Sequence, residues 1–151
     1  MVTAAIALGS NVGDREGHLE FAATRLYGIL ASLKVSRWYE TEPVGVGWQP
    51  MFLNGAAVGV TNLSARQLLD ALMALERERG RERPYTGAPR TLDLDLALFG
   101  DQILSEPGLT VPHAHLRERR FVLEPLAEIA PELVDPVSHL TVSQLLQRLS
   151  A

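Results

Sequence analysis

The amino-acid sequence predicts an α+β fold, because segments typical of strands and of helices follow one another in the order β-α-β-β-α-β. Apolar runs or apolar–polar alternation mark the strand segments, whereas apolar residues recur every three or four positions in the helix segments. Two more helix segments follow towards the C-terminus. This order is typical of a ferredoxin-like antiparallel sheet with additional C-terminal helices. A length of 151 residues predicts a single domain over residues 1–151.

The first strand and the first helix are expected before residue 34. The compact apolar run Val2–Leu8 predicts a buried strand, and Gly9–Asp14 predicts a turn in which Asp14 caps the following helix. A phosphate-binding loop at Gly9–Asp14 is the weaker interpretation, because the Gly-x-x-x-x-Gly-Lys-Ser/Thr pattern is missing. The helix is expected to run to about Leu33, because apolar residues recur at helical spacing: Leu19, Ala22, Ala23, Leu26, Leu30 and Leu33.

Two further strands and two late helices have clear boundaries in the sequence. Strands are expected over Val35–Thr41 and Phe52–Val60, separated by a loop at Glu42–Pro50 that is rich in Gly and Pro. The helix segments near the C-terminus are Phe121–Ile129 and Val142–Leu149. We expect these two helices to pack as additions to the main sheet.

The second helix carries the most complete boundary signals. Ser64 and Gln67 form a capping box at its start, and Gly80 ends it. Arg81–Ala88 then forms a loop that leads into the last strand of the sheet. The apolar face of this helix consists of Leu68, Leu69, Leu72 and Leu75.

The composition excludes several classes of site and partner. The chain has no cysteine, which excludes disulfides and thiolate metal sites, and its four histidines lack the close spacing of a zinc site. A net charge of −4 argues against a protein that coats nucleic acid. No cationic leader or membrane-length apolar run precedes the first strand, so we expect a cytoplasmic protein that binds no membrane. We also expect a monomer.

The strand that follows the 81–88 loop carries two neighbouring carboxylates. Apolar Leu92, Leu94 and Leu96 alternate with Asp93 and Asp95, so both aspartates should project from one side while the leucines enter the core. Two carboxylates held side by side repel each other unless a cation joins them. A hard cation such as Mg²⁺, which prefers oxygen ligands and usually accompanies a phosphate, suits them. The alternative is an acidic solvent-facing strand.

Basic and polar residues near this strand could bind phosphate groups. Arg81 and Arg83 lie in the loop before it, and arginine suits the oxygen atoms of a polyphosphate. Glu76 shares a helical face with two apolar residues, Leu69 and Met73. Further along, the polar residues Thr110, His113 and Arg119 could donate hydrogen bonds to a phosphate, although a single histidine is more often structural.

Phe52 and Phe121 are by default core residues. Asn54 follows Phe52 by two positions and should share its face of the strand. An aromatic ring beside an amide can hold a flat heterocycle, through stacking and paired hydrogen bonds.

Taken together, these segments resemble the 6-hydroxymethyl-7,8-dihydropterin pyrophosphokinase family of the folate pathway. The block Pro89-Arg90-Thr91-Leu92-Asp93-Leu94-Asp95 is highly specific, and the matching segments span almost the whole chain. The family's fold is also ferredoxin-like with added helices. The other matching segments are Gly9-Ser10-Asn11, Thr41-Glu42-Pro43, Phe52-Leu53-Asn54, Gly80-Arg81, Leu109-Thr110-Val111-Pro112-His113, Arg119 with Phe121, and Glu128-Ile129-Ala130-Pro131-Glu132-Leu133.

The resemblance implies a Mg²⁺-dependent transfer of the β,γ-pyrophosphoryl group of ATP to the pterin hydroxymethyl oxygen, with release of AMP. Asp93 and Asp95 would bind two Mg²⁺ ions, and the arginines Arg81 and Arg90 would steady charge during transfer. The implied pterin-binding residues are Thr41, Pro43, Val44, Phe52, Asn54, Asp93 and Phe121. The implied ATP-binding residues are Leu69, Met73, Glu76, Arg83, Arg90, Leu96, Thr110, His113 and Arg119.

The sequence departs from the family pattern at two places. Tyr85-Thr86-Gly87-Ala88 stands ahead of Pro89, where the family usually has a Trp-Gly pair, and Phe52 stands where many members have tyrosine. The alternative function is a non-catalytic nucleotide- or pterin-binding module on the same fold, which would not need the aspartates and arginines together. An RNA-binding domain is disfavoured by the acidic charge and by the lack of the expected aromatic pair.

Overall fold

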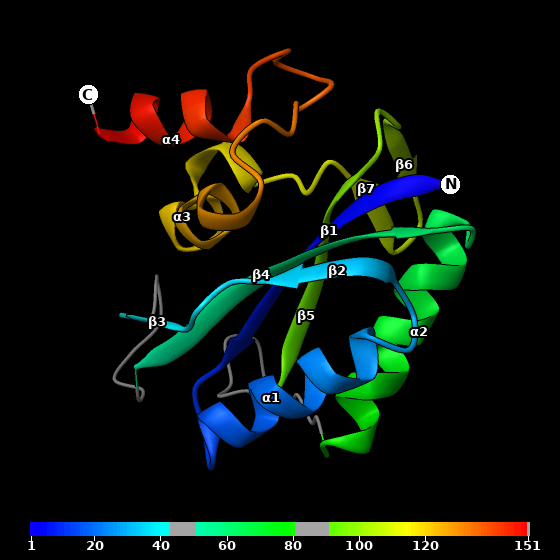
Figure 1. Ribbon diagram of the computed structural model, residues 1–151, viewed down its shortest axis with the longest axis vertical. Helices are drawn as coiled ribbons and strands as arrows, with labels where there is room; N and C mark the ends of the chain where they lie inside the picture. The colour runs from blue at the N-terminus through cyan, green and yellow to red at the C-terminus, as the bar shows by residue number, and fades with distance from the viewer. Residues whose placement is uncertain (43–50, 81–90, 151) are drawn as a thin grey trace.

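The computed structural model describes residues 1–42, 51–80 and 91–150, and it confirms the α+β class with an antiparallel sheet (Figure 1). The C-terminal helices are present where they were predicted. The elements in chain order are β1 (Val2–Ser10), α1 (Arg15–Leu26), β2 (Ala31–Val35), β3 (Tyr39–Thr41), β4 (Phe52–Thr61), α2 (Ala65–Glu78), β5 (Asp93–Phe99), β6 (Leu104–Glu106), β7 (Leu109–Val111), a 3₁₀ turn η1 (Leu116–Glu118), α3 (Arg120–Ile129) and α4 (Val142–Ser150).

The main sheet is built around β1. This strand pairs antiparallel with β4 on one side and with β5 on the other. Both β2 and β3 pair antiparallel with β4, which gives the order β2-β4-β1-β5 with β3 continuing the β2 edge. The short strands β6 and β7 pair with each other in a separate hairpin.

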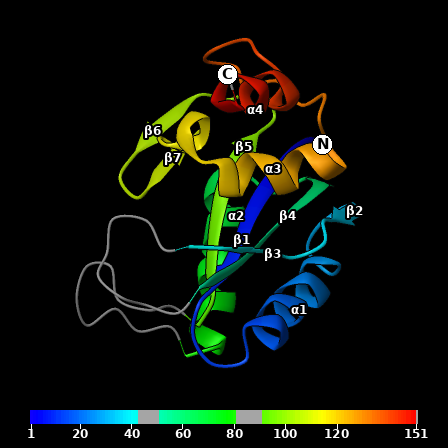
Figure 2. The same ribbon diagram turned by 90° about the vertical axis from the view of Figure 1, so that its left-hand side faces the viewer.

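Helices cover both faces of this sheet. Helices α1 and α2 lie on one face, and α3 and α4 lie on the other (Figures 1 and 2). Because successive side chains of a strand point to opposite faces, Ile6 joins the core with Leu26 and Leu72, while Ala5 joins the core with Leu123. Burial on both faces explains why β1 is apolar at nearly every position. Within the described residues, no helix combines the length and apolar character needed to cross a membrane.

The first helix ends earlier than the sequence predicted. Helix α1 stops at Leu26, and the chain turns through Gly28 before β2 begins at Ala31. The prediction that it runs to about Leu33 was wrong, because Leu30 and Leu33 continue the helical spacing by coincidence. Both leucines pack into the α1–α2 core from the turn and from β2.

The predicted strand Val35–Thr41 is divided in two. Strand β2 ends at Val35, and β3 begins at Tyr39. Between them, the Ser36 hydroxyl accepts a 2.9 Å hydrogen bond from the Ala56 N–H. The Ser36 N–H also donates to Ala56 O at 2.9 Å, so Ser36 bonds to both backbone polar groups of Ala56 in the break between β2 and β3.

The helix caps agree with the sequence, whereas the turn before α1 is shorter than predicted. The Asp14 carboxylate accepts a 3.1 Å hydrogen bond from Gly17 N–H, and both bonds of the capping box between Ser64 and Gln67 are present. Strand β1 includes Gly9 and Ser10, however, so the turn starts after them. Backbone pairing with β4 and β5 keeps this glycine extended.

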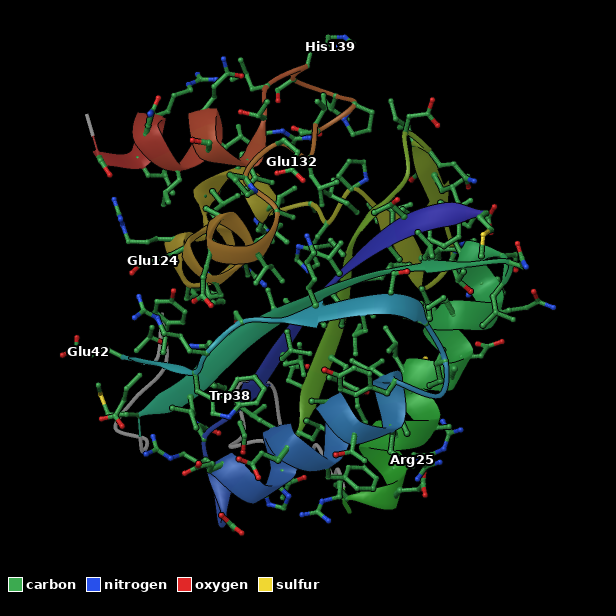
Figure 3. All side chains as sticks on the ribbon, viewed as in Figure 1. Arg25, Trp38, Glu42, Glu124, Glu132 and His139 are labelled. Carbon is green, nitrogen blue, oxygen red and sulfur yellow. The ribbon has the colours of Figure 1, made fainter. Side chains whose placement is uncertain are left out.

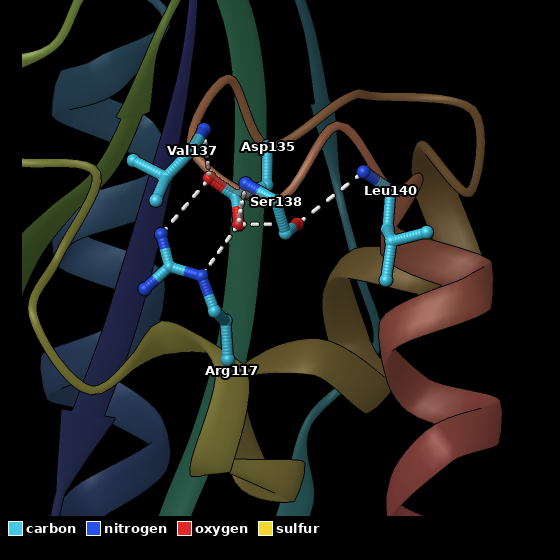
Figure 4. Close-up of polar contacts among 5 residues, drawn as sticks. All are labelled: Arg117, Asp135, Val137, Ser138 and Leu140. Atoms are coloured by element: carbon cyan, nitrogen blue, oxygen red, sulfur yellow. Dashed lines mark hydrogen bonds and ion pairs between the residues drawn. The ribbon is translucent and has the colours of Figure 1, made fainter.

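A buried carboxylate joins the segment before α4 to η1 (Figure 4). Asp135 is fully buried and accepts hydrogen bonds from Arg117 Nε at 2.7 Å and Arg117 Nη2 at 3.1 Å. The Val137 N–H and the Ser138 hydroxyl donate to the same carboxylate at 3.0 and 2.7 Å. Burial alone would raise the pKa of Asp135, but these bonds outweigh it and the pKa is lowered.

Candidate active site

Two carboxylates stand on the side of β5 that faces away from α1 and α2. Asp93 and Asp95 are half-buried on this side, while Leu94 and Leu96 alternate with them and are buried in the α1–α2 core. The strand therefore holds two acidic groups next to each other on a rigid element. This is the arrangement that the Asp93–Asp95 spacing predicted.

Strand register places an amide beside one of these carboxylates. Gly9 of β1 lies opposite Asn54 of β4 and also opposite Asp93 of β5. Residues directly opposite in antiparallel strands project from the same face, so Asn54 and Asp93 flank Gly9. A Cβ atom at Gly9 would lie 3.0 Å from Asn54 Oδ1 and 3.7 Å from Phe52 Cδ1. Because Gly9 has no side chain, it leaves space on the sheet surface between the Asn54 amide, the Phe52 ring and the Asp93 carboxylate.

The Asn54 side chain is held in place by a second strand. Asn54 is buried, and its Nδ2 donates a hydrogen bond to Thr41 Oγ1 on β3. Thr41 itself lies opposite Phe52, which shares the Asn54 face of β4. Three of the predicted pterin-binding residues, Thr41, Phe52 and Asn54, are thus adjacent at one end of the sheet.

A hollow of about 320 Å³ opens between β3 and the start of α3. Its lining includes Thr41 and Phe121, so a fourth predicted pterin-binding residue reaches this end of the sheet from the other layer. The Arg119 guanidinium lies 5.5 Å from the centre of the Phe121 ring, within cation–π range. The other lining residues are Tyr39, Glu40, Arg120, Glu124 and Pro125.

A second hollow, of about 230 Å³, lies beside Asp95 of β5. It gathers the carboxylate Asp95 with four of the predicted ATP-binding residues, Leu69, Leu96, Thr110 and His113. Gly108 and Leu109 also line it, although neither was predicted as a site residue, because the β6–β7 hairpin was not predicted. The Pro107-Gly108 pair is a turn signal that could have revealed this hairpin.

His113 is fixed by its backbone and its ring. Its N–H donates to Ala97 O at 2.9 Å, and its Nδ1 accepts from the His115 N–H at 3.1 Å. Burial and the nearby Arg119 guanidinium lower the pKa of His113, although Asp93 opposes the shift. The imidazole is therefore neutral at neutral pH.

The family model described as 7,8-dihydro-6-hydroxymethylpterin-pyrophosphokinase (HPPK) matches residues 5–131 of the sequence. The chain belongs to the HPPK family. This agrees with the resemblance found in the sequence, and it makes the chain a member of a family of pyrophosphokinases.

Several curated proteins of this family are close in sequence. The chain is 45% identical over 130 residues to 2-amino-4-hydroxy-6-hydroxymethyldihydropteridine pyrophosphokinase of Pseudomonas aeruginosa, covering 85% of this chain and 80% of that protein. It is 41% identical over 148 residues to the enzyme of the same name from Synechocystis, covering 96% of this chain and 75% of the relative. The Bacillus subtilis enzyme of that name is 45% identical over 130 residues, covering 85% and 78%.

Solved structures show the same fold at low sequence identity. A Plasmodium falciparum HPPK-DHPS structure with pteroate matches with a TM-score of 0.75 and 14% identity, covering 97% of this chain and 42% of that one. The wild-type HPPK-DHPS structure with SDX-DHP matches with a TM-score of 0.73 and 15% identity, covering 98% and 43%. The chain therefore spans less than half the length of these two-part proteins.

Two predicted ATP-binding residues on α2 differ in their surroundings. Glu76 is buried, and its Oε2 accepts a 2.8 Å hydrogen bond from the Leu94 N–H. This bond joins α2 to the backbone between Asp93 and Asp95, so Glu76 helps to fix the strand that carries them. Met73 is 44% exposed at the surface of α2.

The two carboxylates of Asp93 and Asp95 suit Mg²⁺ better than a metal ion that is coordinated by protein side chains alone. Within residues 1–42, 51–80 and 91–150, no group of three or more His, Cys, Asp or Glu side chains is arranged to hold a metal ion. Mg²⁺ usually takes one or two carboxylates and completes its shell with water and phosphate oxygens. Asp93 and Asp95 offer that number of carboxylates beside a hollow. The predicted site residues Pro43, Val44, Arg81, Arg83 and Arg90, and also Tyr85, lie outside the described residues.

Proposed function

We propose that this chain transfers the β,γ-diphosphoryl group of ATP to the hydroxymethyl group of 6-hydroxymethyl-7,8-dihydropterin in folate biosynthesis. The observation that carries the proposal is the position of Asp93 and Asp95 beside two separate groups of residues. One group, around Asn54, suits a flat heterocycle, and the other, around His113 and Thr110, suits a nucleotide. Membership of the HPPK family supports the same reaction.

On the pterin side, the Asn54 amide would bind the polar edge of the heterocycle. Phe52 and Phe121 would stack on its two faces, and Asp93 would lie near the hydroxymethyl group. Support comes from the Asn54–Thr41 hydrogen bond, which fixes the amide before the substrate arrives. The sequence adds Pro43 and Val44 to this side.

On the nucleotide side, Leu69 and Leu96 would contact the base, while Thr110, His113 and Arg119 would reach the sugar or the phosphates. A neutral His113 can donate one hydrogen bond to a phosphate without adding charge. Glu76 would act through the β5 backbone. From the sequence, Met73, Arg83 and Arg90 would also contact the nucleotide. Arg81 and Arg90 would stabilise the negative charge that develops during transfer.

The reaction needs positioning more than covalent chemistry. The pterin oxygen forms a bond to the β-phosphorus, the bond from that phosphorus to the α–β bridging oxygen breaks, and AMP leaves with the bridging oxygen. The hydroxyl proton is released to water. Asp93 and Asp95 would hold two Mg²⁺ ions, which when bound supply charge neutralisation and acidify the attacking hydroxyl.

Several properties remain predictions from the sequence: the ferredoxin-like arrangement, the single domain over residues 1–151, the monomeric state and the cytoplasmic location. The strand order β2-β4-β1-β5 supports the first of them. The sheet with helices on both faces supports the second.

The proposed function is tested by separating the products of ATP, Mg²⁺ and the pterin by chromatography, with a control that lacks the pterin. AMP that forms only with the pterin is expected. ADP would mean ordinary kinase chemistry at this site. Nucleotide binding without turnover would favour the alternative, a binding module.

Replacing Gly9 with alanine is expected to weaken pterin binding about three- to tenfold, because the new Cβ would press against Asn54 Oδ1 at 3.0 Å. The amide would have to move away from its Thr41 partner. Fluorescence titration with the pterin measures the dissociation constant. Gly28→Ala is the matched control, because its Cβ would meet Arg25 O at an ordinary 3.4 Å. Equal dissociation constants for wild type and Gly9→Ala would refute the tight fit.

A further inference from the structure

We propose that Tyr39 is a further residue of the pterin subsite and that Glu128 on α3 positions it. The inference rests on the proposed function, because it adds a residue to the same site. Neither residue was among those predicted to bind the substrates.

The strand register places Tyr39 next to Asn54, whose amide is proposed to bind the pterin. Tyr39 of β3 lies directly opposite Asn54 of β4, so the two side chains share one face of the sheet. The row across the sheet therefore runs Tyr39, Asn54, Gly9, Asp93. Trp38, one residue earlier, points the other way into the α1 side, as Figure 3 shows.

Tyr39 also lines the hollow between β3 and α3. The same hollow is lined by Thr41 from β3 and by Phe121 from α3, two of the predicted pterin-binding residues. Tyr39 thus offers an aromatic wall to the space in which the heterocycle would enter. Aromatic walls suit a flat ring because they stack without needing a fixed hydrogen-bond pattern.

Glu128 ties this part of β3 to α3. The Tyr39 hydroxyl donates a 2.6 Å hydrogen bond to Glu128 Oε1, and the Arg37 N–H donates to Glu128 Oε2 at 3.1 Å. The Arg37 side chain completes the cluster, with Nε 3.3 Å from Glu128 Oε1 and the guanidinium carbon 5.1 Å from the centre of the Tyr39 ring. Both oxygens of one carboxylate therefore hold the chain on either side of Trp38.

Strand β3 is also held by its pairing with β4, by the Asn54–Thr41 hydrogen bond and by the 3.0 Å ion pair between Glu40 and Arg15. It has three residues and, within the described residues, pairs only with β4. Phe121 stands near the start of α3 and Glu128 near its end. The bond from Tyr39 to Glu128 therefore links β3 to the same helix from which Phe121 lines the hollow.

The protonation states of Tyr39 and Glu128 keep their hydrogen bond in place across the physiological pH range. Burial and the bond to Glu128 raise the pKa of the Tyr39 hydroxyl. The bond from Tyr39 lowers the pKa of Glu128, even though burial opposes this shift. The phenol therefore stays a donor and the carboxylate stays charged, which makes this a charge-assisted hydrogen bond.

Tyr39→Phe and Glu128→Gln test the proposal, together with the double variant. Tyr39→Phe keeps the ring and removes the donor, whereas Glu128→Gln keeps the shape and removes the charge. We measure the dissociation constants of 6-hydroxymethyl-7,8-dihydropterin and of a non-hydrolysable ATP analogue by fluorescence titration. Each single variant is expected to weaken pterin binding about three- to tenfold and to leave analogue binding within about twofold.

The double variant is expected to bind the pterin no more weakly than the poorer single variant, because both changes break one interaction. Glu78→Gln is the control. It breaks the 2.8 Å pair between Arg25 and Glu78, which joins α1 to α2 on the opposite face of the sheet. This variant should bind both ligands like the wild type.

Unchanged pterin binding in Tyr39→Phe would overturn the inference, as would equal weakening of both ligands with a lowered melting temperature. The proposed function is judged separately, by whether the wild type forms AMP from ATP and the pterin. A wild type that binds the pterin without turnover would refute the function, while the comparison of dissociation constants would still decide the role of Tyr39. Absence of pterin binding by the wild type would overturn both.

Discussion

Replacing Asp95 with alanine is expected to lower kcat more than about a hundredfold, beyond the loss typical of residues that only orient a metal ligand. Asp95 lies on the side of β5 away from the α1–α2 core and lines the nucleotide-side hollow. The carboxylate would bind the metal that neutralises the transferring group, so its loss removes stabilisation from the transition state. Steady-state AMP formation at saturating ATP and pterin measures the effect.

The fold should survive this change. Asp95 lies opposite Ala7 of β1, so a second small side chain fits the same surface of the sheet. The melting temperature of Asp95→Ala should therefore stay near that of the wild type. Asp101→Ala changes an exposed aspartate in the turn after β5 and should leave kcat unaltered. Near-normal turnover by Asp95→Ala would show that Asp95 is not a metal ligand.

Replacing Asp135 with alanine is expected to reduce the free energy of unfolding by about 3–5 kcal/mol, the usual result of removing one partner of a buried ion pair. The change would leave Arg117 without its carboxylate, along with the Ser138 hydroxyl and the Val137 N–H. Urea denaturation of both proteins at neutral pH measures the difference.

The contribution of Asp135 to the free energy of unfolding should also depend on pH. Because its pKa is lowered in the folded protein, its contribution to stability is present above the ordinary carboxyl pKa and disappears as the pH falls through the folded-state pKa. The difference between wild type and Asp135→Ala should therefore shrink in acid. Ser138→Ala removes one donor and should cost only about 1 kcal/mol. A difference for Asp135→Ala as small as that for Ser138→Ala would contradict the account.

The parts of the fold that were predictable from sequence are those set by local chemistry. The Ser64–Gln67 capping box and the alternation around Asp93 and Asp95 depend on neighbouring residues, and both are present in the structure. The end of α1 was missed, because the spacing of Leu30 and Leu33 fits either a helix or a turn followed by a strand. Only packing against the sheet decides between these two possibilities.

The missed parts of the site depend on contacts between distant segments. Gly9 separates Asn54 from Asp93 only because β1 pairs with β4 and β5 in a particular register. The bond from Glu76 to the Leu94 N–H joins a helix to a strand, and the bond from Tyr39 to Glu128 spans 89 positions of the sequence. A single sequence carries no direct signal for such pairs.

The most direct test of the central claim is to follow ATP labelled with ³²P at the β-phosphorus. A diphosphoryl transfer predicts that the label moves to the pterin product and that the AMP is unlabelled. A reaction mixture without the pterin should keep the label in ATP. Label found in ADP, or in free pyrophosphate when the pterin is present, would contradict the account.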